Sequence, residues 1–572
     1  MNKIQPRVRG RRASVEAAVK SLQDDLKLLL AEVDQYLEQV QNYLSDPSEA
    51  AAEDLRHKVA YISSLAMAVR GQNYELEIRP SRDEDQRGPR FLRGLRSIIS
   101  RLHRLSELGL NVVRQFDHLS RPDFPEAYDL EEFFDQIHLG LHLIRPALEQ
   151  RKLKLALRIC EVEERLDALY ADRFQRLIQE MDEGLGQPGD RVTILMMVHY
   201  LERIGDFMLE IGEELLFIFL GENLKYSQYL ALEAGWKASG RTSQPGAAAG
   251  GFHSIWSGRS GCRLGVVRIE GIGEAEGEPV FFKHGPAAKL EKERDNLDLW
   301  AGLWPGLPPA VRAFVPAEEG EGSAALVLEY IRGRTLRDLF IEKGGGQEAV
   351  KELLRAMTLM GGLWKETRRD EETRAGFVRQ TEKRLGPVRS LYPDLLNFKG
   401  LVGDIRIKSI DSLLEEASRY ERDLPAPFAV RIHGDFNLSN IMRDESSGDF
   451  RFIDLHRSRL SDYAQDLSVM ILSILRLPLT GPEVRARLSQ AANVIWTFAR
   501  DFAASAHDPS LEARLSFGLA RSYLTSARFE PRRAVAARFL GYSRHLWEKL
   551  AEYGSTGRPW SEFRLDHRAL YV

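Results

Sequence analysis

The chain has 572 residues, more than one hydrophobic core usually supports, so we expect two or more domains. Its 80 Lys and Arg nearly balance its 84 Asp and Glu, which leaves a formal net charge of -4. That balance argues against a dedicated nucleic-acid binder and against a strongly acidic solvating protein. The two cysteines, Cys160 and Cys262, form no CxxC pair. They suggest neither a disulfide framework nor a structural zinc site, and a reducing cytoplasm is the expected location.

No targeting or membrane segment is expected. The basic N-terminus, MNKIQPRVRGRR, lacks the apolar core of a secretory signal and is interpreted as a solvated lead-in to a helix. The longest apolar runs are ELLFIFL and LSVMILSIL. Both are much shorter than the roughly 20 residues that a membrane-spanning helix needs.

The N-terminal part is typical of a helical bundle. From Ser14 to about Gly235, apolar residues recur every three or four positions and glycines are few, as in SVEAAVKSLQDDLKLLLAEV. The stretch 235–251, GWKASGRTSQPGAAAGG, loses this period and fills with small residues and Pro. We therefore predict an all-α domain over 1–234 and a flexible linker over 235–251.

The remainder predicts a two-lobed α+β fold. Short β-prone runs bounded by glycines, CRLGVVRIEG, EPVFFKHG and AALVLEYIRG, indicate a sheet-rich lobe over 252–332. Helical patterns return over 333–572, where FAVRIHGD and FRFIDLH are strand-like and the turn-rich RDESSGD precedes the second of them.

The helical part contains an internal repeat. Leu102–Val112 reads LHRLSELGLNV and Leu201–Ile211 reads LERIGDFMLEI, which predicts two copies of one helical unit, with chance similarity of amphipathic helices as the alternative. Glu202 and Asp206 lie four apart, so their carboxylates share one helix face. With Asp167 from another helix they would offer oxygen ligands to a hard cation, although an Arg-paired surface is the more common arrangement.

The segment YLERIGDFMLEIGEE resembles the signature of the PhoU-like family of phosphate-signalling proteins. The resemblance covers most of 14–220. It implies two tandem three-helix repeats and metal binding by Glu202 and Asp206. In the first repeat, His103 and Glu107 occupy the matching positions, a departure that puts a second metal cluster in doubt.

The segment HGDFNLSN has the spacing of a phosphotransferase catalytic loop, with His433, Asp435 and Asn440 in place. Phosphoryl transfer needs a carboxylate at the attacking hydroxyl and oxygen ligands for magnesium. We assign the first role to Asp435. Asn440 is predicted to bind Mg²⁺ together with Asp454, which follows the strand-like FRFI.

Candidate nucleotide-binding residues precede this loop in the order of a kinase. Lys283 ends the β run PVFFK, where it would reach the nucleotide phosphates. Glu293 would hold that lysine by an ion pair, with Glu291 as the rival. A glycine-bearing turn that would cover the phosphates contains Gly258, Ser260 and Gly261. The backbone at Glu329 and Ile331 would lie beside the adenine.

From about Phe252 onward the chain resembles the aminoglycoside phosphotransferase and choline kinase group, whose catalytic loop reads HGDxxxxN and whose metal strand ends in IDx. The resemblance implies a protein-kinase-like fold, and it makes Asp462 and Asp466 loop-anchoring rather than catalytic. Asp454 is followed by Leu455 and His456, not by Phe-Gly, which disfavours a protein kinase. His456 and Arg457 would either contact phosphate or stabilise the loop.

The leading functional hypothesis is an ATP- and Mg²⁺-dependent phosphotransferase that acts on a hydroxyl of a small molecule. The N-terminal domain would respond to metal or phosphate, with a phosphate-signalling protein or a second copy of the chain as partner. One alternative is a non-catalytic regulator that only binds nucleotide, and another is a protein-directed kinase. The intact Asp435, Asn440 and Asp454 argue for catalysis. The motifs do not identify the acceptor, and a shared fold does not imply antibiotic resistance.

Overall fold

The computed structural model describes residues 5–77, 87–120, 124–185, 187–238, 252–254, 262–267, 279–316, 322–344, 346–396, 400–402 and 405–570. The chain divides into two compact units, residues 1–284 and 285–572. Each unit is described separately below.

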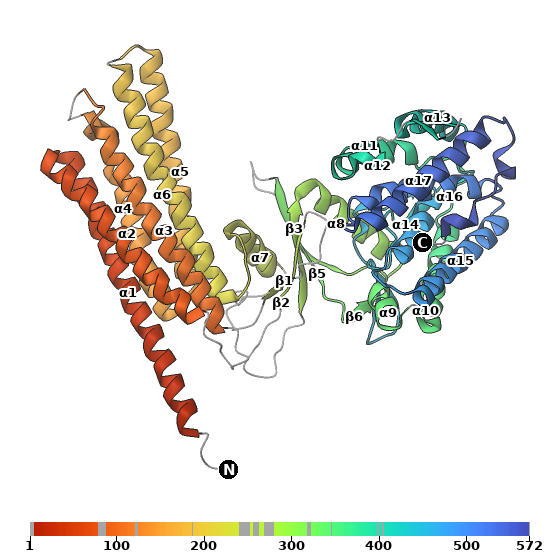
Figure 1. Cartoon of the computed structure of the whole chain (residues 1–572), viewed down its shortest axis with the longest axis horizontal. Coiled ribbons are helices and arrows are strands. Elements are labelled where there is room, and N and C mark those ends of the chain that lie inside the picture. The colour runs from red at the N-terminus through yellow and green to blue at the C-terminus, as the bar shows by residue number, and fades with distance from the viewer. Residues whose placement is uncertain are drawn as a thin grey trace. The chain divides into compact units, whose positions relative to one another are not determined.

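Long helices that run side by side make up most of the first unit (Figure 1). The first three are α1 (Gln5–Ser45), α2 (Glu49–Glu77) and α3 (Arg87–Phe116). The next three are α4 (Glu131–Gln150), α5 (Leu153–Asp182) and α6 (Pro188–Leu220), and a shorter α7 (Tyr226–Ala238) follows. The N-terminal region is thus all-helical, as the sequence pattern predicts, and its helices form two successive groups of three.

The two similar sequence segments occupy equivalent places in these groups. Leu102–Val112 lies in α3 and Leu201–Ile211 in α6, each the third helix of its group. Helices α3 and α6 pack against each other, and α6 also packs closely against α5. At Gly212 a Cβ would lie 2.3 Å from Sγ of Cys160, so the close approach of α5 and α6 requires glycine at this position.

Three antiparallel strands, β1 (Phe252–Ser254), β2 (Arg263–Val267) and β3 (Val280–Pro286), follow the helices. Strand β2 pairs with β1 on one side and with β3 on the other, where Leu264 lies opposite Lys283. The division between the two units falls inside β3.

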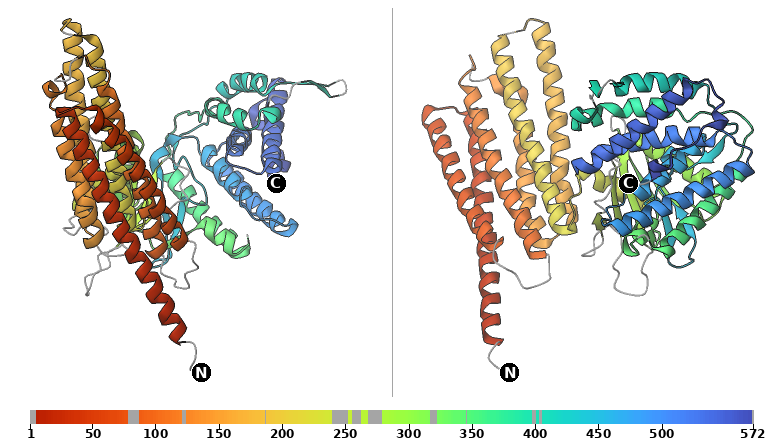
Figure 2. Two further views of the ribbon diagram at one scale, coloured as in Figure 1. Left: turned by 60° about the vertical axis from the view of Figure 1, so that its left-hand side comes forward. Right: turned by 45° about the vertical axis from the view of Figure 1, so that its right-hand side comes forward.

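The second unit begins with α8 (Ala287–Leu303), which packs on the antiparallel pair β4 (Val311–Val315) and β5 (Ser323–Glu329). The helices that follow gather together in the second unit (Figure 2). They are α9 (Leu336–Glu342), α10 (Gln347–Glu366), α11 (Phe377–Leu391), α12 (Pro393–Leu396), α13 (Ile410–Arg422), α14 (Ala464–Leu475), α15 (Pro482–Ser505), α16 (Leu511–Ala527) and α17 (Arg533–Gly554).

Helix α16 is the centre of this group of helices. Every one of its residues except Glu512 is buried, and it packs against α11, α14 and α17. A helix that is enclosed on all sides must satisfy its polar side chains within the protein. Two arginines, Arg514 and Arg521, are nevertheless buried in this helix.

Short strands connect the helices to the predicted catalytic loop. Strand β9 (Val430–Ile432) pairs with β12 (Arg459–Ser461), and β10 (Ile441–Asp444) pairs with both β11 (Phe450–Phe452) and β6 (Gly333–Thr335). These strand pairs confirm the strand-like character of FAVRIHGD and FRFIDLH. A further pair consists of β7 (Gly400–Val402) and β8 (Ile405–Ile407).

The predicted linker begins inside a helix, because 235–238 are the last residues of α7. Residues 239–251 lie outside the described part of the chain, so the domain limits that the sequence suggested stay a prediction. Among the described residues, no helix combines the length and apolar character needed to cross a membrane. The run LSVMILSIL belongs to the buried helix α14.

Candidate active site

The HGD motif forms a tight loop directly after β9. Gly434 adopts φ +84°, and a Cβ at this position would lie 2.3 Å from the carbonyl oxygen of Arg457. Both the backbone conformation and the close approach require glycine. The loop is held from below by the buried Asp466 at the start of α14, whose carboxylate oxygens accept the N–H groups of His433 and Gly434, both at 2.8 Å.

Asp435 follows this turn and presents its carboxylate to several donors. Oδ2 accepts a hydrogen bond from Nη1 of Arg457 at 2.9 Å, and Oδ1 accepts one from Nδ2 of Asn437 at 3.2 Å. The backbone carbonyl of Asp435 accepts a bond from Nδ2 of Asn440 at 2.9 Å. The carboxylate is therefore oriented by neighbours but remains partly exposed, as a group that meets a substrate must be.

A hairpin brings the two predicted magnesium ligands together. Ile441 at the start of β10 lies opposite Phe452 at the end of β11, and the N–H of Ile453 donates to the carbonyl of Asn440 at 3.0 Å. Asn440 immediately precedes this hairpin and Asp454 leaves it. Because Nδ2 of Asn440 is already bonded to the loop, its Oδ1 is the atom that remains for a cation.

Asp454 has a left-handed backbone with φ +64° and ψ +49°. A non-glycine residue in this region costs free energy and is often found at functional sites. The next three residues, Leu455–Arg457, form a short 3-10 helix that directs His456 back toward the aspartate, with His456 Nδ1 at 3.2 Å from Asp454 Oδ1.

Helix α8 adds a further carboxylate to this corner. Asn296 Nδ2 donates to the carbonyl of Leu455 at 2.9 Å, and Trp300 Nε1 donates to Oγ of Ser458 at 2.8 Å, so α8 is fixed on the segment after Asp454. Side-chain ligand atoms of Glu293, Asp454 and His456 all lie within 4.8 Å of one another. Among the described residues this is the one group of three or more such side chains that meets that spacing.

The donor set fits a divalent cation. Carboxylate oxygens from Glu293 and Asp454 and the amide oxygen of Asn440 are the hard ligands that Mg²⁺ prefers, whereas the His456 nitrogen is better suited to a transition metal. His456 therefore fits best as a hydrogen-bond partner that orients Asp454. Glu293 is 1 % exposed whereas Glu291 is exposed, so burial favours Glu293 over Glu291 as the predicted partner of Lys283.

The structure describes some of the predicted nucleotide-binding residues and not others. Lys283 lies in β3 with 4 % of its surface exposed, as a lysine that meets a buried partner would. Gly258, Ser260 and Gly261 lie outside the described residues. The N–H of Glu329 donates to the carbonyl of Ala310 at 2.9 Å, which leaves the residues after it, including the buried Ile331, to offer backbone donors to a base.

The side chain of Glu329 has a structural role that the sequence did not suggest. Its Oε2 accepts bonds from the N–H of Ala310 at 3.0 Å and from Nη2 of Arg451 at 2.6 Å. This carboxylate ties the end of β5 to β11, the strand that leads to Asp454. It therefore helps to hold the strand before Asp454 in place.

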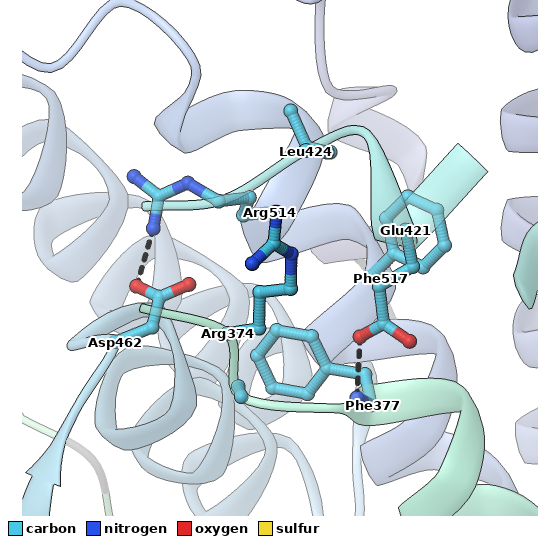
Figure 3. A pocket seen from close by; sticks show the side chains of 8 residues that line it. Arg374, Phe377, Glu421, Leu424, Asp462, Arg514 and Phe517 are labelled. Atoms are coloured by element: carbon cyan, nitrogen blue, oxygen red, sulfur yellow. Dashed lines mark hydrogen bonds and ion pairs between the residues drawn. The ribbon is translucent and has the colours of Figure 1, made fainter. Parts of the chain in front are cut away.

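Asp462 belongs to a buried charge network behind the loop. Arg514 of α16 forms ion pairs with Asp462 and with Asp508, and all three side chains are almost fully enclosed. A small cavity beside this network is lined by Arg374, Phe377, Glu421 and Phe517 (Figure 3). Glu421 accepts the N–H groups of Phe377 and Val378 and so secures the start of α11.

Burial changes the pKa values of two groups that support the loop. Desolvation lowers the pKa of His433 to about 4, and the neutral ring packs edge-on against Trp300. Burial also raises the pKa of Asp466 to about 7, although the two backbone N–H groups that it accepts act in the opposite direction. His433 therefore stays neutral at physiological pH, whereas the protonation of Asp466 changes close to it.

In the N-terminal bundle, the charges of Glu202 and Asp206 of α6 act on those of Glu163 and Asp167 of α5. No three of these four carboxylates come within 4.8 Å of one another in the described part of the chain. Burial and the negative charges of Asp167 and Asp206 raise the pKa of Glu163 to about 7. Burial also raises the pKa of Glu202, and its Oε2 lies 3.2 Å from Nδ1 of His199. Asp206 accepts a bond from Arg203 at 2.7 Å, the Arg-paired arrangement weighed from the sequence.

Several residues near Asp435 carry no motif in the sequence. Arg384 of α11, Arg521 of α16 and Arg528, which follows α16, lie close enough to the loop for their charges to interact with Asp435 or Arg457. Arg521 is 5 % exposed. In the sequence these residues differ from their neighbours only as arginines within otherwise apolar or small-residue helical patterns.

Both parts of the chain match models of known protein families. Residues 267–504 match the model of the Phosphotransferase enzyme family, and residues 130–215 match that of the PhoU domain. The second match covers α4, α5 and most of α6. A phosphate-specific transport system accessory protein PhoU homolog from Xylella fastidiosa is 26% identical over 217 residues, which cover 36% of this chain and 89% of that protein.

Two solved structures are similar to parts of the chain. PhoU from Pseudomonas aeruginosa is 18% identical with a TM-score of 0.33, and covers 36% of this chain and 99% of its own. The apo form of a thermostable mutant of aminoglycoside phosphotransferase APH(4)-Ia is 16% identical with a TM-score of 0.36, and covers 56% of this chain and 99% of its own. By the two family matches, the chain joins an N-terminal PhoU-like helical region to a C-terminal region that matches the Phosphotransferase enzyme family.

Proposed function

We propose that the C-terminal domain transfers the γ-phosphoryl group of ATP to a hydroxyl of a small molecule and depends on Mg²⁺. The observation that supports this most directly is the position of Asn440 and Asp454 at the two ends of one hairpin, with Asp435 five residues before Asn440. A domain that only bound nucleotide would need the cation ligands but not an oriented carboxylate for the acceptor.

In this reaction Asp435 takes the proton of the acceptor hydroxyl. The acceptor oxygen forms a bond to the γ-phosphorus, the bond from that phosphorus to the β–γ bridging oxygen breaks, and ADP leaves with the electron pair. Arg457 and Asn437 orient the carboxylate of Asp435 toward the acceptor. Asp466 keeps the loop in position because it accepts two of its backbone N–H groups.

Asn440 and Asp454 would hold Mg²⁺, with Glu293 at the side of the same corner. When bound there, the cation supplies positive charge to the phosphoryl group during transfer. Lys283 is proposed to orient the nucleotide phosphates, and the glycine turn at Gly258, Ser260 and Gly261 to cover them.

The first test is ATP turnover with a pool of hydroxylated metabolites and mass detection of products. Asp435→Asn should abolish the phosphorylated product, because the amide cannot accept the hydroxyl proton. Asp449→Asn is the matched control, since Asp449 is an exposed carboxylate in the turn of the β10–β11 hairpin. ATP binding without any product in the wild type would contradict the proposed enzyme and favour a nucleotide-binding regulator.

For the N-terminal domain we propose a regulatory role that responds to a cation or to phosphate status. Glu163, Asp167, Glu202 and Asp206 support it, because a bound cation would offset the burial and the repulsion that together raise the pKa of Glu163. Calorimetric titration with Mn²⁺ tests this role. Glu202→Gln should weaken binding by about tenfold or more, and equal binding by both proteins would exclude these carboxylates as ligands.

A further inference from the structure

Five arginines lie around the catalytic loop and come from separate parts of the second unit. We call them the arginine cluster: Arg384 in α11, Arg457 after Asp454, Arg459 in β12, Arg521 in α16 and Arg528 at the end of α16. Their charges are opposed nearby by the carboxylates of Asp435 and Asp466. The region beside the proposed catalytic base is therefore strongly positive.

Helix geometry directs the cluster toward one place. Arg384 and Phe377 are seven residues apart and thus share a face of α11. The guanidinium of Arg521 lies 5.6 Å from the centre of the Phe377 ring, so this face of α11 meets α16 at Arg521. Arg528 lies seven residues after Arg521, on the same side of α16. The three arginines accordingly follow the seam between α11 and α16.

The loop that carries Asp435 lies near this seam, because the charges of Asp435 and Arg457 act on Arg384 and Arg521. Arg457 contacts Asp435 at 2.9 Å. Arg459 donates from Nη2 to Oε1 of Gln465 at 2.8 Å, and Gln465 donates from Nε2 to the carbonyl of Gly434 at 3.0 Å. Two members of the cluster are thus bonded to the loop, directly or through one side chain. The side chain of Arg457 is 41% exposed, so a ligand from solvent can reach Arg457.

Two other members lack the partners that buried arginines normally have. Nε and Nη2 of Arg521 and Nε of Arg528 are buried and make no hydrogen bond within the described part of the chain. Among these residues neither arginine forms an ion pair with a carboxylate. By contrast Arg514, on the same buried helix as Arg521, pairs with both Asp462 and Asp508. A buried guanidinium without an anion is costly, and a bound anion would supply the missing acceptor.

Burial and, to a smaller extent, the neighbouring positive charges disfavour the charged forms of these arginines. Burial, with the positive charges of Arg384, Arg457 and Arg459, lowers the pKa of Arg521 to about 9, while Asp435 acts in the opposite direction. Burial, with Arg457 and Arg528, also lowers the pKa of Arg384. An oxyanion among them would relieve the repulsion between these positive charges.

We propose that the acceptor is an alcohol that carries an oxyanion, a phosphate or a carboxylate, which the arginine cluster binds while Asp435 receives the hydroxyl. Arginine suits this role because its planar donors match both groups. An aminoglycoside is a polycation at neutral pH, so the same positive field opposes it. The inference rests on the proposed phosphotransferase function and specifies its class of acceptor.

The experiment uses the full chain with Mg²⁺ and a non-hydrolysable ATP analogue. Four probes share one three-carbon scaffold: glycerol 3-phosphate, glycerate, the neutral glycerol and the cationic serinol. Binding is measured by calorimetry or ligand-detected NMR. We expect the two anionic probes to bind at least about tenfold more tightly than glycerol and serinol. The better of the two anions identifies phosphate or carboxylate as the preferred group.

Variants assign the binding to the cluster. Arg384→Gln should weaken binding of the anionic probes about 10- to 100-fold, the loss of one charge-assisted contact. Arg521→Met should weaken binding of the anionic probes to a similar extent. If the buried Arg521 proves necessary for folding, the variant of the half-buried Arg384 still tests the cluster. Arg419→Gln is the control, because Arg419 is 61% exposed and pairs with Glu415 on its own helix. It should leave binding unchanged.

Equal binding of all four probes, or equal binding by wild type and Arg384→Gln, would overturn the inference. So would loss of anion binding when the ATP analogue occupies the protein, since the cluster would then serve the nucleotide. Anion binding without transfer to any acceptor would instead refute the phosphotransferase function and leave the anion site intact. Transfer only to neutral or cationic acceptors would establish the enzyme and refute this acceptor class.

Discussion

The guanidinium of Arg457 donates a hydrogen bond to the carboxylate of Asp435, with 2.9 Å between Nη1 and Oδ2. The two residues are separated by 22 positions, and the hairpin of β10 and β11 returns the chain between them. Arg457 therefore couples the segment after Asp454 to the loop that carries Asp435. It also fixes one oxygen of Asp435 and leaves the carboxylate accessible to an acceptor.

Replacement of Arg457 should lower turnover. Arg457→Gln removes a charge-assisted hydrogen bond of about 1.5–3 kcal/mol, so we expect kcat to fall about 10- to 100-fold. Steady-state kinetics with the acceptor found in the metabolite screen measures it, with Arg419→Gln as the control. The KM for ATP should change little. A rise in the KM for ATP with unchanged kcat would place Arg457 on the nucleotide instead.

Substitution of Gly434 should disrupt the loop. Gly434→Ala adds a Cβ 2.3 Å from the carbonyl oxygen of Arg457 at a residue with φ +84°, so the backbone must move. We expect a loss of about 1–3 kcal/mol in unfolding free energy and little remaining activity. Urea denaturation measures it. The control, Gly362→Ala, lies in α10 with nothing within 4 Å and should stabilise slightly. Similar effects of both changes would contradict this geometry of the loop.

Two buried groups should give opposite pH dependences of stability. The pKa of His433 is lowered from 6.5 to about 4, so its stabilising contribution is lost as pH falls through that range. The pKa of Asp466 is raised from 3.8 to about 7, so its contribution is present at low pH and is lost as pH rises toward 7. The two effects oppose each other in the wild type.

Variants separate these contributions. Relative to wild type, His433→Gln should become more stable as pH falls from 7 to 5, and Asp466→Asn should become less stable over the same interval, each by about 1–3 kcal/mol at most. Differences in urea unfolding free energy at each pH measure this, because the other titrating groups cancel. Parallel pH curves for all three proteins would rule out both assignments.

The buried network around Arg514 should be essential for stability. Arg514→Met leaves Asp462 and Asp508 as enclosed carboxylates without their cation. We expect a destabilisation of about 3–5 kcal/mol, since one partner of a buried ion pair is removed. Arg419→Gln breaks an exposed pair on α13 and should cost less than about 1 kcal/mol. Thermal or urea unfolding distinguishes the two, and equal small effects would show that the network contributes little.

Removal of the proposed metal ligand should change the cation requirement. Asp454→Asn replaces a carboxylate ligand by an amide, so the Mg²⁺ concentration that supports half-maximal turnover should rise about 10- to 100-fold. A magnesium titration of ATP turnover measures this change. Asp449→Asn, in the turn of the same hairpin, should leave the curve unchanged. An unaltered requirement in Asp454→Asn would exclude this residue as a ligand.

Local patterns were sufficient for much of the architecture. The three- and four-residue apolar periods predicted the helices of the N-terminal region, and the similarity of Leu102–Val112 to Leu201–Ile211 predicted their repeat. The spacing within HGDFNLSN predicted site roles for Asp435 and Asn440, which stay predictions, and the strand-like FRFI is confirmed as the strand after which Asp454 follows. These features depend on residues close in sequence, whose geometry the local backbone sets.

Other features depended on packing between distant segments. Asp466 reaches a loop 32 residues earlier, Glu329 is joined to Arg451 across 122 positions, and Arg521 meets Phe377 where α16 packs on α11. No local period predicts such contacts, because a charged side chain in a helix is usually solvated. The sequence by itself determined the helical and strand-rich regions, and it predicted a phosphotransferase loop with its residues. Only the tertiary structure decided which arginines surround that loop, because their meeting depends on how the helices pack.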